Sequence, residues 1–328
     1  MTSNMQSSEM TIDEVEIIPD LVYAVPNGKE LLADLYVPKN RPTPLPVIIW
    51  LHGGGWRFGD RKLGPDFSKY FARRGFAMVS IEYRLSEEAI FPAPVHDVKT
   101  AVRWVRTIAE TYGFDPHKIG LWGSSAGGHL AAMTATTGSE QFIGENPEYP
   151  GIPSEVQAVA IGYGPVDFLK MDEQKVQDGI IEEDPESAHI PKDKKTTDPD
   201  SFESLFLGAP ILTCPDRVSA ANPTTYIKPG LSLPPFLIMH GVNDTAVSAQ
   251  QSEILYQAIA EEGNDVSLYL IKGLGHGFLN RTNVDDDGPK LANCRISKAG
   301  IEESNEERVH FIFWTIEQFF ERTLMTFD

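Results

Sequence analysis

Residues Ile119–His129 read IGLWGSSAGGH, and this stretch decides the predicted fold. Ile119–Trp122 is a short apolar run typical of a buried strand, and the residues from Gly128 onward are typical of a helix. Between them, Gly123–Gly127 matches the pattern G-x-S-x-G, with Ser125 at its centre. The order strand, sharp turn and helix presents a serine hydroxyl at the top of an α/β sheet.

A steric requirement explains the two outer glycines of this pattern. A serine at the apex of such a turn has a strained backbone, and Gly123 and Gly127 let strand and helix approach without side-chain collision. The helix that follows directs its first amides toward the serine, where negative charge develops during acyl transfer. We therefore predict that Ser125 is a nucleophile.

Length, composition and charge exclude several classes of function. The chain has 328 residues, 41% of them hydrophobic, which suits one α/β domain with insertions. Its formal net charge of −19 argues against nucleic acid and anionic membranes as partners, because a negative surface repels both. No apolar run reaches membrane-spanning length, and the start MTSNMQSSEM lacks the features of a signal peptide. We expect a cytoplasmic protein or the mature form of a secreted enzyme.

The two cysteines, Cys214 and Cys294, are too few for a disulfide framework or a zinc site. The sequence leaves open whether they pair, and two free thiols are the expectation in a reducing compartment. It does not determine the oligomeric state.

Apolar runs alternate with helical stretches along most of the chain. Buried strands are expected at Val47–Leu51, Ala77–Ile81, Ile119–Trp122, Val156–Ile161, Pro235–His240 and Val266–Ile271. Such alternation predicts a mostly parallel sheet with helices on both faces. Two β-rich runs at Val15–Val25 and Leu31–Val37, separated by a turn signal, should add an antiparallel edge.

Helices are predicted between these strands and at the end of the chain. The strongest amphipathic pattern begins near Pro94 and ends at Gly113. Further helices are expected at Phe67–Arg74, at Gln250–Glu262 and from about Asn305 to Leu324. We predict a single domain over residues 1–328.

Residues 170–222 interrupt the alternation. Their first part, Met171–Asp200, is acidic and poor in large apolar side chains, and short helices are expected at Ser201–Leu207 and Asp216–Ala221. An insertion at the carboxyl edge of a sheet is positioned to act as a lid, so we expect a lid or cap here.

A nucleophilic serine needs an imidazole base that is itself oriented by a carboxylate. In this fold the chain order is Ser, then Asp or Glu, then His, each in a loop after a strand. His276 lies in a glycine-flanked loop after Val266–Ile271, and Asp244 follows Pro235–His240. We predict a catalytic set of Ser125, Asp244 and His276, with helix capping as the alternative role for Asp244.

The chain also contains three consecutive glycines in His52–Trp56, directly after a buried strand. A structural turn needs one or two glycines, so three indicate backbone amides that approach a ligand closely. The amides of Gly54, Gly55 and Ala126 are therefore predicted to form an oxyanion hole. No metal or organic cofactor is implied, because the predicted triad supplies the nucleophile, the base and the electrostatic stabilisation.

The set HGGGW at 52–56, GSSAGGH at 123–129, Asp244 and His276 resembles the α/β-hydrolase esterases. Within them it resembles the bacterial bifunctional feruloyl and acetyl-xylan esterases, and more distantly the hormone-sensitive-lipase-like carboxylesterases. The latter usually have Asp before the nucleophile, where this chain has Ser124. The resemblance covers about Leu31 to the final helix, and it implies an α/β-hydrolase fold; the acidic stretch Met171–Asp200 matches no motif of the family.

The resemblance implies a serine carboxylic-ester hydrolase that acts on small-molecule or carbohydrate-linked esters. Trp56, Phe58 and Phe278 are candidates for lining the substrate pocket and would suit an aryl group, with ordinary packing as the alternative. Other hypotheses are an amidase or formamidase, or a prolyl-oligopeptidase-like peptidase. A non-catalytic binding protein on the same scaffold is a third class, but such proteins typically lack a triad member.

Overall fold

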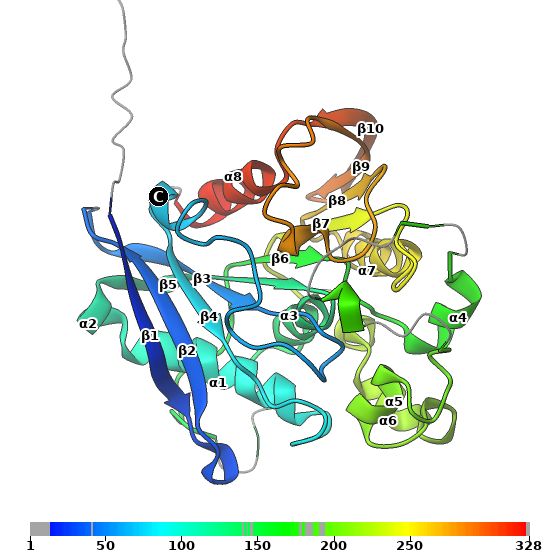
Figure 1. Ribbon diagram of the computed structural model, residues 1–328, viewed down its shortest axis with the longest axis horizontal. Coiled ribbons are helices and arrows are strands. Elements are labelled where there is room, and N and C mark those ends of the chain that lie inside the picture. Colours follow the sequence, from blue (N-terminus) through cyan, green and yellow to red (C-terminus); the bar gives the residue numbers. More distant parts are fainter. Residues whose placement is uncertain are drawn as a thin grey trace, which may run out of the picture.

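One large sheet organises the structure (Figure 1). The computed structural model describes residues 14–40, 42–139, 141–142, 144, 147–176, 179–180, 186–189 and 194–325. Ten strands of this part of the chain form the sheet in the order β1-β2-β4-β3-β5-β6-β7-β8-β9-β10. Its parallel strands, in spatial order, are β4 (Ala77–Ile81), β3 (Leu45–Leu51), β5 (Phe114–Ser124), β6 (Ala158–Gly162), β7 (Phe236–Gly241) and β8 (Val266–Ile271).

Antiparallel hairpins extend both edges of this parallel centre. On one side β2 (Leu31–Pro38) pairs with β4, and β1 (Val15–Ala24) pairs with β2. On the other side β9 (Lys290–Lys298) pairs with β8, and β10 (Ile301–Val309) pairs with β9. The α/β fold with a mostly parallel sheet is therefore confirmed.

Hydrophobic cores lie on both faces of the sheet, as β3 illustrates. Successive side chains of a strand point to opposite faces, and accordingly Ile49 and Leu51 join one cluster while Ile48 and Trp50 join the other. Each cluster is closed by helices. The first face is covered by α1 (Ala93–Thr107), α2 (Ala109–Tyr112), α3 (Ala126–Thr136) and α7 (Gln250–Glu261), and the second by α8 (Ile312–Leu324).

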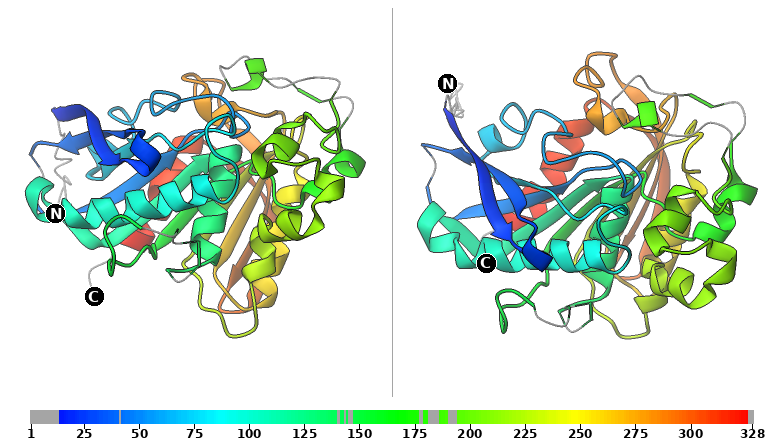
Figure 2. Two further views of the ribbon diagram at one scale, coloured as in Figure 1. Left: turned by 90° about the horizontal axis from the view of Figure 1, so that it is seen from below. Right: turned by 60° about the horizontal axis from the view of Figure 1, so that its bottom comes forward.

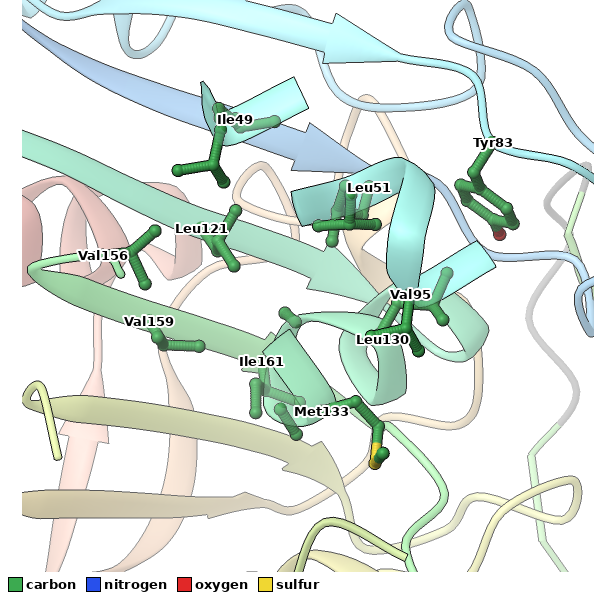
Figure 3. Close-up of a cluster of buried hydrophobic side chains, with 14 of the residues drawn as sticks. Ile49, Leu51, Tyr83, Val95, Leu121, Leu130, Met133, Val156, Val159 and Ile161 are labelled. Carbon is green, nitrogen blue, oxygen red and sulfur yellow. The ribbon is translucent and has the colours of Figure 1, made fainter. Parts of the chain in front are cut away.

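The figures show how these layers sit. In Figure 2, α1 lies in front of the sheet and α8 behind it. Figure 3 shows Leu121 and Ile161 of the sheet pointing toward Leu130 and Met133 of α3. Because this contact is fully apolar, α3 is held firmly on the strand that precedes it, which fixes the turn between them.

The described residues of the 170–222 segment form short elements beside the carboxyl edge of the sheet. They include α4 (Met171–Gln174), α5 (Phe202–Leu207) and α6 (Pro215–Ala220), which group on one side of the molecule in Figure 1. Part of the predicted acidic stretch lies outside the described residues. Ile180 forms an isolated β-bridge with Asp244, so the insertion contacts one of the predicted catalytic loops.

Two predicted elements were wrong. The final helix begins at Ile312 rather than near Asn305, and the residues before it form the β9–β10 hairpin. Most of β10 is exposed at the sheet edge, so its polar sequence has no apolar alternation that marks a strand. The helix expected at Phe67–Arg74 is only a 3-10 turn at Ala72–Arg74, and Phe67 and Phe71 pack into the core.

Two further features bear on the sequence-based expectations. Cys214 and Cys294 are both free thiols. Among the described residues, no helix combines the length and the apolar character that a membrane crossing requires.

Candidate active site

The parallel strands bring the three predicted catalytic residues to one edge of the sheet. Ser125 directly follows β5, Asp244 follows β7 and His276 follows β8. Since the carboxyl ends of parallel strands lie at the same edge, residues 151 positions apart in the chain become neighbours. All three side chains are largely withdrawn from solvent.

The turn at Ser125 has the strained backbone that the sequence predicts. Ser125 has φ 48° and ψ −117°, a backbone conformation that residues other than glycine rarely adopt. A Cβ on Gly123 would lie 2.4 Å from the carbonyl carbon of Gly127, and one on Gly127 would lie 2.1 Å from the carbonyl oxygen of Leu51. Both glycines are therefore required by backbone contacts, and Gly127 seats the turn against the end of β3.

Hydrogen bonds connect the three side chains in series. The Nε2 atom of His276 lies 3.0 Å from the Oγ atom of Ser125, and its Nδ1 atom lies 2.7 Å from Oδ2 of Asp244. In a neutral imidazole one ring nitrogen donates and the other accepts, so a carboxylate at Nδ1 fixes the proton there. This leaves Nε2 able to accept the proton of the serine.

The Asp244 carboxylate is held in place from several sides. The amides of Ala246 and Val247 donate to its Oδ1 at 2.8 and 2.9 Å, and His240 approaches Oδ2 at 3.2 Å. Burial raises the pKa of this carboxyl, but His276 and then His240 outweigh burial and hold the pKa well below its usual range. Asp244 is therefore ionised. It accepts hydrogen bonds from the turn that follows it and contacts His276 at the same time, so the capping role and the contact with the imidazole are compatible.

The glycine run lies beside this set of residues. Gly54 and Gly55 have φ of 106° and 60°, which favours glycine, and the amides of Arg57 and Phe58 bond back to the carbonyl of Gly54 at 3.0 Å. Ala126 opens α3. Within the described part of the chain, the amides of Gly54, Gly55 and Ala126 donate to no acceptor. These three donors are available to a ligand.

The three aromatic residues proposed for a substrate pocket have different surroundings. Trp56 is 1% exposed and stacks on Phe206 at 4.4 Å between ring centres. Phe278 is fully buried against Tyr163. Both therefore pack in the interior, which is the alternative that the sequence left open. Phe58 is half-buried.

Sequence reasoning missed two polar residues that lie at the same centre. Glu186 is 1% exposed, and its Oε1 lies 3.7 Å from Nε2 of His276. Its Oε2 accepts a hydrogen bond from the side-chain amide of Asn280 at 2.5 Å and from the hydroxyl of Ser124 at 3.3 Å. No pattern marks Glu186, because every carboxylate of an acidic stretch looks alike in sequence.

Two carboxylates thus face the His276 imidazole. Burial lowers its pKa by penalising the charged ring, but Asp244 and, to a smaller degree, Glu186 outweigh burial and raise the pKa above its usual range. The arrangement therefore favours the protonated imidazole.

No metal centre is evident in the part of the chain that the structure describes, where no three His, Cys, Asp or Glu side chains group in a way that suits a metal ion.

A known protein family matches more than half of the chain. Residues 33–259 match the BD-FAE family model, a span that includes Ser125 and Asp244 and ends before His276. The chain belongs to the BD-FAE family. It is 31% identical to the esterase LipC and 29% identical to the esterase LipQ, both from Mycobacterium tuberculosis, over 75% and 74% of its length. It spans only 57% and 53% of those two proteins.

Solved structures of similar fold are also esterases. A truncated carbohydrate esterase from gut microbiota superposes with a TM-score of 0.70 at 25% identity, covering 95% of this chain and 97% of that one. The butyrate-bound Est2 esterase of Thermogutta terrifontis has a TM-score of 0.59 at 28% identity, covering 82% and 86%. The resemblance to the α/β-hydrolase esterases is therefore confirmed.

Proposed function

We propose that this protein is a carboxylic-ester hydrolase that forms an acyl-enzyme on Ser125. The observation that carries the proposal is the hydrogen-bonded series from Ser125 through His276 to Asp244, with distances of 3.0 and 2.7 Å. The same Ser-His-Asp arrangement activates serine in unrelated hydrolases, because the imidazole removes the hydroxyl proton as the bond to the acyl carbon forms. Esterases among the relatives and structural neighbours support this reaction.

The reaction runs in two acyl transfers. The Oγ atom of Ser125 attacks the ester carbonyl carbon while Nε2 of His276 takes its proton, and the imidazolium then returns that proton to the departing alcohol. Water repeats the sequence on the acyl-enzyme and releases the carboxylic acid. Asp244 keeps the proton on Nδ1 and stabilises the imidazolium throughout.

The amides of Gly54, Gly55 and Ala126 are proposed to bind the carbonyl oxygen as it becomes negative. Preorganised donors of this kind act on charge that exists only in the tetrahedral state, so they lower the barrier rather than merely binding the substrate.

For the substrate we propose feruloyl or acetyl esters linked to a carbohydrate. The BD-FAE match and the carbohydrate esterase from gut microbiota support this class. The packed positions of Trp56 and Phe278 leave Phe58 as the candidate aromatic contact, which favours the small acetyl group over the bulky feruloyl group.

Replacing the nucleophile tests the proposed reaction. Ser125→Ala should lower kcat for p-nitrophenyl acetate on the order of 10⁴-fold or more, since loss of one triad member disables the whole set. A fluorophosphonate probe should label the wild type and not the variant. Undiminished turnover by a correctly folded Ser125→Ala protein would refute the proposal.

A substrate panel tests the finer assignment. It should contain acetylated xylan, methyl ferulate and p-nitrophenyl acyl esters of rising chain length, together with a matched anilide. We expect the highest kcat/KM for acetyl esters. Cleavage of the anilide without cleavage of the ester would point instead to an amidase or peptidase.

A further inference from the structure

The carboxylate of Glu186 lies on the side of His276 that must face the substrate. Its Oε1 is 3.7 Å from Nε2, the nitrogen that also lies 3.0 Å from Ser125 Oγ. In the proposed reaction this nitrogen exchanges protons with the serine and with the leaving alcohol, so the reacting ester has to lie beside it. Glu186 therefore stands where part of an ester has to bind.

The position of Glu186 is built by specific contacts. Asn280, which follows the His276 loop, and Ser124, which precedes the nucleophile, both donate to its Oε2. The carboxylate also fills the space over Gly53, where an added Cβ would lie 1.8 Å from Oε1. A side chain of 1% exposure with two side-chain donors is a defined arrangement rather than a surface charge.

Other described residues of the insertion contact the remaining loops of the site. The ring of His189 stacks on Phe58, with 4.5 Å between ring centres. The ring of Phe202 covers Gly55, where an added Cβ would lie 2.3 Å from that ring. Ile180 donates its amide to the carbonyl of Asn243 at 2.8 Å, next to Asp244. The insertion thus covers the glycine run and reaches the loop that carries Asp244.

We propose that Glu186 is a tethered competitor of the ester: its carboxylate occupies the substrate side of the His276 imidazole, and hydrolysis requires it to leave. The inference rests on the proposed function, since it assigns His276 as the base. A carboxylate is also the chemical class of the acid that ester hydrolysis releases, so Glu186 resembles a bound product that cannot diffuse away. No covalent step is involved.

Charge adds a second effect at the same place. In the described part of the chain, the titratable groups that face the imidazole include Asp244 on Nδ1, Glu186 on the Nε2 side and the ring of Tyr163 at 4.7 Å, with His240 behind Asp244. A negative charge beside Nε2 stabilises the imidazolium, which has no free site for the serine proton. It also opposes the negative charge that develops on the substrate oxygen.

Two substitutions separate occupancy from charge. Glu186→Ala removes the occupant, whereas Glu186→Gln keeps its volume and removes its charge. The exposed Glu173 on α4 belongs to the same insertion, so Glu173→Gln is the charge-matched control. Thermal unfolding of each variant establishes that the fold is retained.

Glu186→Ala should raise kcat/KM for p-nitrophenyl acetate, and the rate of fluorophosphonate labelling of Ser125, by roughly tenfold or more. That magnitude follows because a minor open conformation is typically about 0.1–10% populated and limits the apparent affinity. Glu186→Gln should move the acid limb of the kcat/KM profile to lower pH by about one unit or more, since loss of the nearby charge lowers the pKa of His276. Glu173→Gln should change neither quantity.

The two proposals fail in different ways. If the wild type hydrolyses esters and both Glu186 variants are equally fast or slower, with an unmoved acid limb, the competitor role is wrong and the esterase assignment stands. If neither the wild type nor any variant hydrolyses an ester or reacts with the probe, the proposed function itself is wrong.

Discussion

The loops that carry Ser125, Asp244 and His276 differ from the 170–222 insertion in how each places a side chain. The first group directly follows buried parallel strands, whose pairing and close glycine contacts bring the three loops to one edge of the sheet. The insertion places Glu186 with the help of side-chain hydrogen bonds from Asn280 and Ser124, which lie far from it in the chain. Under the two proposals made above, the scaffold provides the reaction chemistry and the insertion controls access to it.

This difference predicts opposite signs for substitutions in the two regions. A change in the strand-end loops should lower activity, because it disturbs groups that act in the transition state. A change in the insertion contacts should raise activity, because it weakens a competitor. The following variants test the contrast in order of decreasing effect.

Asp244→Asn should have the largest effect among these variants. The amide keeps the shape of the side chain but cannot stabilise the imidazolium, and the comparable substitution in other serine hydrolases lowers kcat by about 10⁴-fold. Steady-state kinetics with p-nitrophenyl acetate measure the loss, with far-ultraviolet circular dichroism as the check on folding. A loss below tenfold would show that His276 does not depend on this carboxylate and would remove the contrast.

Gly127→Ala should reduce stability even though Gly127 lies within α3. Alanine normally stabilises a helix relative to glycine by about 0.5–1 kcal/mol. Here its Cβ would meet the carbonyl oxygen of Leu51 at 2.1 Å, and overpacking of this kind typically costs about 1–3 kcal/mol. We expect a lower urea midpoint and reduced kcat. An unchanged midpoint would mean that the turn is free to shift, contrary to the rigid scaffold described above.

Phe58→Ala should have the smallest effect, in the opposite direction. It removes the stacking of Phe58 on the ring of His189, with 4.5 Å between ring centres, an interaction typically worth about 0.5–1.5 kcal/mol. The contact between the insertion and the glycine-run loop should therefore be weaker. We expect a rise of a few-fold in kcat/KM for small acetyl esters. A fall in kcat/KM confined to methyl ferulate would instead identify Phe58 as a contact for the aryl group.

The turn at Ser125 shows why part of the candidate site could be predicted from local sequence. The strained φ of Ser125 and the close approach of strand and helix impose glycine at fixed offsets, so the pattern at 123–127 carries its own geometry. The glycine run at 53–55 carries similar information, because the positive φ values at positions 54 and 55 favour glycine. Such steric requirements act within a few residues and are therefore legible in sequence.

The edges of the molecule show where local patterns fail. The polar strand β10 reads as part of a helix because its exposed side chains lack apolar alternation, and only its pairing with β9 makes it a strand. Trp56 and Phe278 are aromatic residues near the predicted catalytic motifs, but the packing of Phe206 and Tyr163 against them decides that both are buried. Composition does not encode these long-range contacts.

The sequence by itself determined the mostly parallel α/β sheet and the glycines that the turn at Ser125 requires, because strand periodicity and backbone sterics are local; the α/β-hydrolase fold followed from the resemblance of its motifs to a known family. Only the tertiary structure decided that Glu186 faces His276. Its position depends on Asn280, 94 residues away in the chain, and on the space left over Gly53. A hydrogen bond between such distant residues forms only after the sheet has brought their loops together.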